Sequence, residues 1–423
     1  MENRLATKKY IPPKILLWFF AIYAVFTMAC YMLPYTQFVM PYTIMAPLML
    51  FSFVWMFFGG EESIGYSTIV VVASLVMMFA VIIAQRLDLV TGINTAIRDM
   101  RFFLPVLWGV FALKYANEKQ RKIILVVFVA LILLVVGKTI EAVRVEPMIV
   151  RLLAQDKTRG NTEINAYRLN NVAGYTFSYM MGAVVICAAW IASNSYGKLL
   201  KGVGIVVLVL SFFFVIETMY ATLLILSFLG IVLVLFVKSK NIITKVVIIF
   251  FGLIAVILME DIMEGLSNLF AFSDVLHIKF RDMHNAIKYG DISQVGSRPQ
   301  LIFEALGNWA KSPLFGSSEV NRAHSTVFSI LQESGIVGLS LWIAALSYAI
   351  RIIKKRLQSK NIDTRMFGVC AAYVVILSVF NDIRSIYELT IVVFFIVPVL
   401  SVYITENMEK SKNFSLRRKR HAK

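Results

Sequence analysis

The sequence has few of the residues that build metal centres and disulfide frameworks, with three cysteines and four histidines among 423 residues. Cys30, Cys187 and Cys370 lie in separate apolar runs, so we predict neither a disulfide framework nor a zinc knuckle. No His-Glu-x-x-His segment occurs, and His277 and His284 are seven residues apart. The histidine pattern therefore does not predict a metal site.

Charged residues are also scarce, at 16%, whereas 59% of the residues are hydrophobic and the mean hydropathy is +0.76. A soluble domain has roughly 45–50% apolar residues, and a soluble chain this apolar would expose large hydrophobic patches. The apolar residues gather in runs of roughly 17–22 residues, the length that crosses a bilayer as a helix. Because lipid offers no partner for free backbone groups, we expect these runs to be helical.

We therefore predict an all-α, polytopic membrane helix bundle of about 12 transmembrane helices that forms one domain over residues 1–423. Two long extracytoplasmic loops with short amphipathic helices, 141–171 and 260–323, and a basic cytoplasmic tail, 405–423, complete the prediction. The predicted spans are 15–33, 38–58, 64–84, 101–113, 123–140, 172–192, 199–214, 220–237, 241–259, 325–350, 366–380 and 387–404.

The chain is basic, with 42 Lys and Arg against 25 Asp and Glu. In a membrane protein we interpret this excess as loops that face anionic lipid on the cytoplasmic side, and we predict no nucleic-acid partner. With both termini in the cytoplasm, the short inner segments carry most of the basic residues. One inner segment, 59–63, differs, because it carries Glu61 and Glu62 and no basic residue.

The first long loop is rich in arginine, which the outer face of a membrane protein normally lacks. The guanidinium fork matches phosphate oxygens. Arg168 stands a few residues before a predicted span, where the diphosphate of a membrane-bound substrate would lie, and Arg159 is an alternative in the same loop. The other interpretation is a set of solvated charges near lipid headgroups.

The second long loop contains a predicted amphipathic helix that begins after Ser297, a favourable N-cap, with Pro299 in its first turn. Arg298 also lies in this first turn, where a cation costs up to ~1 kcal/mol. An anion bound there would offset that cost, so Arg298 is a candidate phosphate ligand. The alternative is an exposed arginine that points to water.

His324 lies at the start of the predicted span 325–350, beside Arg322, where it could donate a hydrogen bond or shuttle a proton. Glu217 is flanked by apolar residues at the same membrane face and is a weaker candidate for a general base.

Glu333 lies about two and a half turns into the same predicted span. A carboxylate there needs a partner and is a candidate functional residue. Asp382 and Arg384, in the last outer loop, are expected to pair with each other.

Several of these residues form a pattern: Arg298, Trp309, Pro313-Leu-Phe-Gly316, His324 and Leu331-Gln-Glu-Ser-Gly-Ile-Val-Gly338. The pattern resembles the signature region of the O-antigen ligase and O-antigen polymerase superfamily, over about 40 residues of the chain. The predicted topology and loop sizes are similar over the whole chain. Two departures are Gly316-Ser-Ser, where many members have Gly-x-Gly, and a loose upstream arginine motif, for which Arg159 and Arg168 compete.

The resemblance implies a glycosyltransferase of the bacterial cytoplasmic (inner) membrane that polymerises undecaprenyl-diphosphate-linked oligosaccharide repeat units for O-antigen, capsule or exopolysaccharide. It implies no metal or other cofactor, and it implies membrane lipids and a chain-length regulator protein as further partners. The alternatives are a ligase that transfers the glycan to lipid A core, and, from another class, a transporter or flippase of lipid-linked sugars.

The resemblance also assigns roles to the candidate residues. His324, Arg298 and Glu217 would be catalytic, and the diphosphate would be bound by Arg168, Arg159, Arg298 and Arg322.

Overall fold

A computed structural model describes residues 13–408 of the chain except 41, 85–87, 156–160, 195–197, 290–297 and 318–322. Within that part every regular element is a helix. Eight of the helices are long and apolar enough to cross a membrane, and three shorter apolar helices accompany them. The structure therefore confirms the predicted all-α, polytopic membrane bundle.

The first half of the chain supplies α1 (Lys14–Met32), α2 (Pro34–Val39), α3 (Tyr42–Leu50), the 3-10 turn η1 (Phe51–Trp55), α4 (Met56–Gly59), α5 (Glu61–Ala84), α6 (Leu89–Phe103), α7 (Pro105–Tyr115), α8 (Glu118–Val145), α9 (Ile149–Gln155), α10 (Thr162–Leu169) and α11 (Tyr175–Ala192). The second half supplies α12 (Lys198–Glu217), α13 (Ala221–Lys238), α14 (Ile242–Ile257), α15 (Met259–Leu269), α16 (Asp274–Tyr289), α17 (Arg298–Lys311), α18 (Thr326–Gln358), α19 (Arg365–Phe380), α20 (Tyr387–Ile391) and the π-helical turn η3 (Val392–Ile396).

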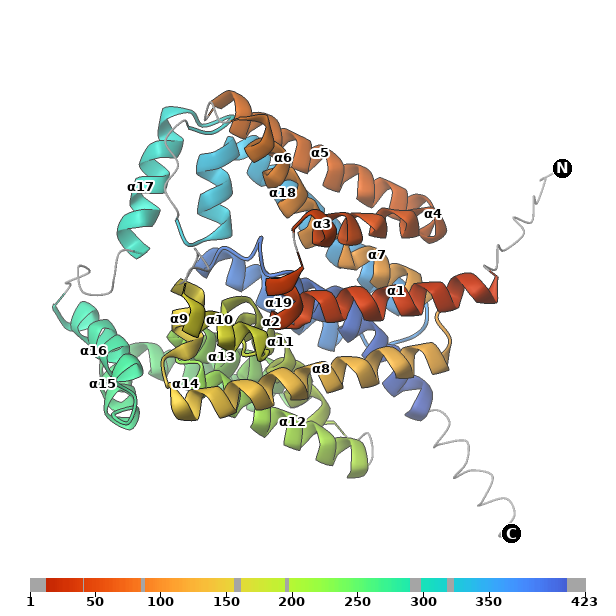
Figure 1. Ribbon diagram of the computed structural model, residues 1–423. Coiled ribbons are helices and arrows are strands. Elements are labelled where there is room, and N and C mark those ends of the chain that lie inside the picture. The colour runs from red at the N-terminus through yellow and green to blue at the C-terminus, as the bar shows by residue number, and fades with distance from the viewer. Residues whose placement is uncertain are drawn as a thin grey trace, which may run out of the picture.

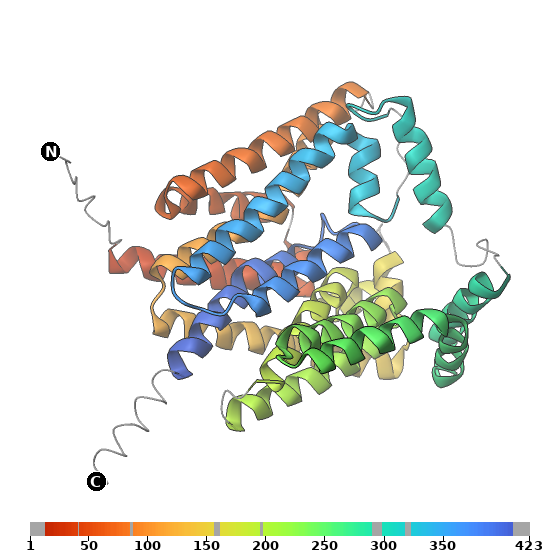
Figure 2. The ribbon, with the colours of Figure 1, turned by 180° about the vertical axis from the view of Figure 1, so that it is seen from behind.

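The two ends of the bundle carry different elements (Figures 1 and 2). The start of α1 and the last described part of the chain lie at one end, which we call the termini end, and the short helices α9, α15, α16 and α17 lie toward the other, the loop end. Where α5 begins, Glu62 forms ion pairs with Lys355 and, at 3.2 Å, with Arg356. These basic partners explain how the acidic segment 59–63 is accommodated on a face predicted to be basic.

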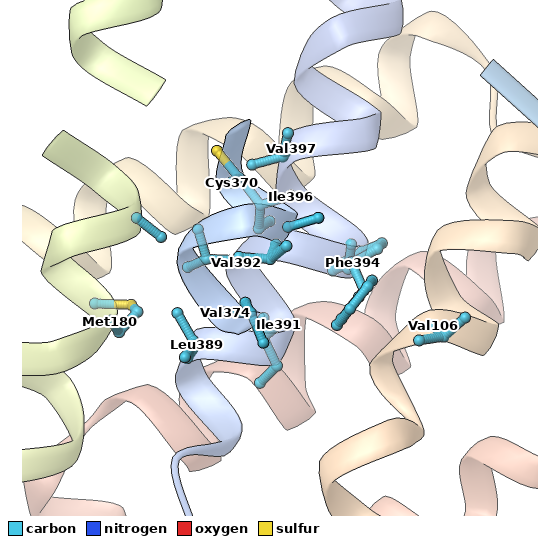
Figure 3. Packing of buried hydrophobic residues seen from close by; sticks show 14 of the residues in the cluster. Val106, Met180, Cys370, Val374, Leu389, Ile391, Val392, Phe394, Ile396 and Val397 are labelled. Atoms are coloured by element: carbon cyan, nitrogen blue, oxygen red, sulfur yellow. The ribbon is translucent and has the colours of Figure 1, made fainter. Parts of the chain in front are cut away.

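The last apolar segment, Tyr387–Met408, is the central element of the bundle, and most of it is buried inside the protein. Figure 3 shows residues from Leu389 to Val397 of this segment together with Val106, Met180 and Cys370 from its neighbours α7, α11 and α19. A helix that is apolar on all sides can lie in lipid or inside a bundle. The buried Glu388 favours the position of this segment inside the protein, because a carboxyl group facing lipid is costly.

Two of the three cysteines meet inside the bundle. The sulfur atoms of Cys187 in α11 and Cys370 in α19 are 3.5 Å apart, and both residues are buried and free. Because these two cysteines are 183 residues apart in the chain, the sequence analysis did not predict that they lie close together.

Three predicted spans are interrupted. The span 38–58 is divided among short helices, with Pro47 inside α3. The predicted span 101–113 is divided between two helices, because α6 ends at Phe103 and α7 begins at Pro105 and has only 11 residues. Proline lacks the N–H that would continue a preceding helix, so α6 ends there. The span 325–350 is broken at Gly335.

Gly109 allows α7 to pack closely against η3, because a Cβ atom at this position would lie 2.0 Å from the backbone oxygen of Phe394. We expect Gly109→Ala to lower the melting temperature of the detergent-purified chain, with a destabilisation of about 1–3 kcal/mol. Gly137→Ala is the matched control, because a Cβ atom there would meet nothing within 4 Å. Equal melting temperatures for the two variants would contradict the close packing of α7 on η3.

Candidate functional site

Five charged side chains form one ion-pair network that joins α6, α18 and the loop 381–386. Arg384 donates to both carboxylate oxygens of Glu333, and from Nε and Nη2 to Asp382 at 2.9 Å each. Arg98 of α6 forms ion pairs with Asp99 at 3.2 Å and with Glu333 at 3.6 Å. Because buried charges require partners, the network fixes these three segments relative to one another. It also confirms the predicted pairing of Asp382 with Arg384.

Asp382 lies in the loop between α19 and α20. Burial alone would raise the pKa of its carboxyl group, but the charge of Arg384, its hydrogen bonds and the charge of Arg98 hold the pKa well below the ordinary value. A carboxyl group with a lowered pKa contributes stability above its unfolded-state pKa, and this contribution is lost as the pH falls toward the lowered value. The carboxyl group of Asp382 is therefore ionised at neutral pH.

Glu333 is positioned by a break in α18 two residues later, at Gly335, whose φ is 66° and ψ −166°. The backbone N–H groups of Ile336 and Val337 donate across the break to the carbonyl oxygens of residues 313 and 314, at 2.9 and 3.3 Å. The segment between α17 and α18 thus supplies acceptors that the interrupted helix lacks.

Two glycines allow this segment to reach the break. A Cβ atom at Gly316, where φ is 89°, would lie 2.4 Å from the backbone oxygen of Glu333, and one at Gly335 would lie 2.3 Å from the Leu314 carbonyl group. Only glycine combines a positive φ with so close an approach. The segments 313–316 and 331–338, which carry most of the pattern found in the sequence, therefore have a packing role in this chain.

Three cavities of about 240, 460 and 550 Å³ lie among α2, α3, α6, α9, α10, α11 and α20. They adjoin one another through shared lining residues. The first and second share Gln37, Phe38, Thr176 and Glu388, and the second and third share Arg101 and Tyr387. We call the three cavities together the arginine cleft, because they are lined by Arg98, Arg101 and Arg168.

The arginines of the cleft are held in defined positions. Arg101 donates from Nη2 to the Tyr387 hydroxyl at 2.6 Å, and its guanidinium carbon lies 4.4 Å from the centroid of the Tyr387 ring. Arg168 donates to Asn165 Oδ1 at 2.6 Å and to the Leu153 carbonyl oxygen at 3.2 Å. Planar guanidinium groups fixed in this way lose little conformational entropy when they bind an anion.

One wall of the cleft is apolar and one is polar. Val39, Met40 and Met45 line the second cavity on the side of α2 and α3, and Val39 is half exposed at 52%. On the side of α20, Glu388 accepts hydrogen bonds at Oε1 from Gln37 Nε2 and from Thr176 Oγ1, both at 2.7 Å. The cleft therefore presents charged groups beside a hydrophobic surface.

The residues selected from the sequence are not brought together at this cleft. Arg168 lines it, whereas His324, which is exposed, and Glu217, which is half-buried at the end of α12, do not. Arg298 begins α17, and the amphipathic helix predicted there is present, but the position of its side chain lies outside the described part of the structure. Arg159 and Arg322 lie outside the described residues.

Arg101 and Glu388 were not selected from the sequence. Both lie in predicted spans, 101–113 and 387–404. An ionisable residue inside a membrane span is a candidate functional residue by default, and this signal would have identified both.

Comparison with known proteins gives one match. The sequence model of the Peptidase M50B-like family matches residues 156–275, less than a third of the 423 residues. These residues include α11, α12, α13, α14 and α15. No curated protein and no solved structure matches the chain.

The matched family consists of membrane metallopeptidases, so we tested whether the residues of this chain fit a catalytic zinc ion. Such sites use histidine and carboxylate ligands, commonly from His-Glu-x-x-His. The matched segment contains no histidine. His277 and His284, which follow it, contact the backbone oxygens of Ser267 and Glu260 through Nδ1 at 2.9 and 3.2 Å. Among the described residues no three His, Cys, Asp or Glu side chains cluster, so they do not fit a zinc site.

The match contradicts the expected membership of the O-antigen ligase and polymerase superfamily. The predicted glycosyltransferase activity, in its polymerase and ligase forms, and the flippase alternative are wrong on the same finding. The structure supplies a physical reason for the misleading pattern. The proline and the glycines of the pattern allow the segment before α18 to pack against the break in that helix, and Glu333 has Arg384 as its partner.

We expect Arg384→Gln to destabilise the chain by up to about 3–5 kcal/mol, because it removes the buried guanidinium group that pairs with the half-buried Glu333 and Asp382. Arg365→Gln is the matched control, since Arg365 pairs with Asp363 at an exposed site and its loss should cost at most about 1 kcal/mol. Thermal unfolding of both variants in detergent measures the difference. Similar melting temperatures would show that the network does not hold the fold.

The surroundings of the two histidines also predict the zinc content of the purified chain. The purified chain should contain far less than one zinc ion per molecule, because His277 and His284 are engaged by backbone groups and do not cluster with other ligands among the described residues. Elemental mass spectrometry after growth with added zinc measures this content. One tightly held zinc ion that is lost in His277→Ala would contradict the prediction.

Proposed function

We propose that this multi-pass membrane protein binds the anionic head of an amphipathic ligand in the arginine cleft. The observation that carries the proposal is the location of Arg98, Arg101 and Arg168 on one cleft whose other wall is apolar. Guanidinium groups are suited to phosphate and carboxylate oxygens, and their attraction for an anion is stronger beside low-dielectric walls than in water.

The apolar wall supports an amphipathic ligand rather than a small soluble anion. Val39, half exposed, continues the wall of α2 toward the surface of the bundle. A ligand with an acyl or similar chain could place its head beside Arg101 and its chain along Val39, Met40 and Met45. Burial of the chain would contribute about 0.8 kcal/mol per CH₂ group.

The proposal includes an orientation in the cytoplasmic membrane. The basic residues of the short segments favour a cytoplasmic location for the termini end. The arginine cleft would then open to the outer leaflet, near the loop 381–386. A ligand would enter it laterally from the lipid.

A second candidate is a membrane-inserted polypeptide, which the Peptidase M50B-like match favours. Its carboxylate groups would use the same arginines. Because the described residues do not fit a zinc ion, we derive no hydrolytic step for this candidate.

We expect Arg101→Gln to weaken the binding of dodecyl phosphate to the purified full-length chain by roughly 10- to 100-fold, because a charge-assisted hydrogen bond is lost. Arg101→Lys should recover only part of the affinity, because an ammonium group cannot reproduce the planar fork. Titration in a neutral detergent, followed by thermophoresis, measures these affinities.

Arg144→Gln is the matched control, since Arg144 is exposed at the end of α8 and does not line the cleft. It should bind dodecyl phosphate like the wild type. Absence of saturable binding by the wild type, or an equal loss in both variants, would overturn the proposal. Laurate and an apolar peptide with a free or an amidated C-terminus complete the panel. Preference for the free peptide over both small amphiphiles would select the polypeptide candidate.

A further inference from the structure

Glu388 is the acidic residue that lines the cleft. It lines two of the three cavities and is only 1% exposed. Its Oε1 atom receives two hydrogen bonds, from Gln37 and Thr176. Its Oε2 atom is buried and has no hydrogen-bond partner among the residues that the structure describes.

An unsatisfied buried carboxylate oxygen is costly, by about 1–3 kcal/mol or more. Both carboxylate oxygens of Glu333, in contrast, accept hydrogen bonds from Arg384. Glu388 instead has two neutral donors on one oxygen and a cavity beside the residue. Its geometry is that of an acceptor held ready for a donor that the described residues do not provide.

The surroundings of Glu388 limit what that donor can be. Arg101 and Glu388 line the same cavity, and Arg168 and Glu388 line the next one. If the anion of a ligand lies beside either arginine, the head of that ligand therefore occupies a cavity that Glu388 also lines. A second anionic group would be repelled by the carboxylate, whereas a hydroxyl or an ammonium group would donate to it.

We propose that Glu388 accepts a hydrogen bond from a donor group, a hydroxyl or an ammonium, that the ligand carries next to its anionic group. This inference rests on the proposed function and names the class of ligand more closely. The ligand is an amphiphile with an anion and a neighbouring donor in its head. Arg101 or Arg168 holds the anion, and Glu388 favours those anionic ligands that carry a neighbouring donor group.

Four probes with the same dodecyl chain separate the contribution of the anion to the affinity from the contribution of the neighbouring donor group. Dodecyl phosphate carries the anion alone, and its glycerol and ethanolamine esters add hydroxyl and ammonium donors. The choline ester adds a cation that cannot donate. The full-length wild type should bind the glycerol or the ethanolamine ester roughly 10-fold or more tightly than the choline ester, the size expected of a hydrogen bond to a charged group.

Glu388→Gln is the informative variant, because its amide oxygen can still accept from Gln37 and Thr176 while an amino group replaces Oε2. Its affinity for the preferred ester should fall by roughly 10-fold or more. Its affinity for dodecyl phosphate should rise, because a negative charge has been removed from the cleft. A structural defect would lower both affinities together.

Two further variants keep the test decisive. Glu388→Asp retains the charge but moves the carboxylate away from the ligand, so it should also lose the preference. It serves as the test if Glu388→Gln does not fold. Glu406→Gln removes a carboxylate that pairs with Arg121 far along the same segment, and it should retain the preference.

Each outcome is decisive. Failure of the wild type to bind dodecyl phosphate or its esters overturns the proposed function. Binding of dodecyl phosphate without preference for either donor-bearing ester overturns the inference about Glu388 alone, as does a preference that persists in Glu388→Gln and Glu388→Asp. A preference for one ester identifies the donor as a hydroxyl or an ammonium.

Discussion

The ion pairs of Arg384 hold together the parts of the chain that build the arginine cleft. Arg384 lies three residues before Tyr387, and its partner Glu333 connects it to Arg98, three residues before Arg101. Displacement of the loop 381–386 would therefore move both the polar wall formed by α20 and the guanidinium group supplied by α6. In a membrane bundle such charges remain only when they are paired, so the network is a strong restraint on geometry.

The membrane bundle could be predicted from the sequence because bilayer thickness sets the length of its apolar runs. The sequence analysis did not predict where these helices are interrupted. Pro105 and Gly335 lie in runs whose composition is apolar enough to cross, and each marks a place where a predicted span is divided. Hydropathy records only the transfer of side chains into lipid. It does not record whether a neighbouring segment, such as residues 313–314, satisfies the backbone groups at a break.

The site was predictable only where its signal is local. The selection of Arg168 and the pairing of Asp382 with Arg384 follow from charges at the edges of spans, and the selection of Glu333 follows from a charge inside one. The contact of Arg101 with Tyr387 joins residues 286 apart, and that of Gln37 with Glu388 joins residues 351 apart. The short pattern around Pro313–Gly316 and Gly335 misled for a related reason. Glycines and a proline that close a helix break form a pattern without specifying any chemistry, and the identity of the ligand depends on residues elsewhere.

The ion-pair network also has a consequence for the synthesis of the chain. Glu333 precedes Arg384 by 51 residues, so it is synthesised before its bidentate partner. Arg98 is already in place by then and lies 3.6 Å from Glu333 in the finished bundle. It provides a first counter-charge for the N-terminal part of α18. Insertion of this helix can thus proceed in two stages, in which Arg98 receives the carboxylate and Arg384 completes the network when the last helices arrive.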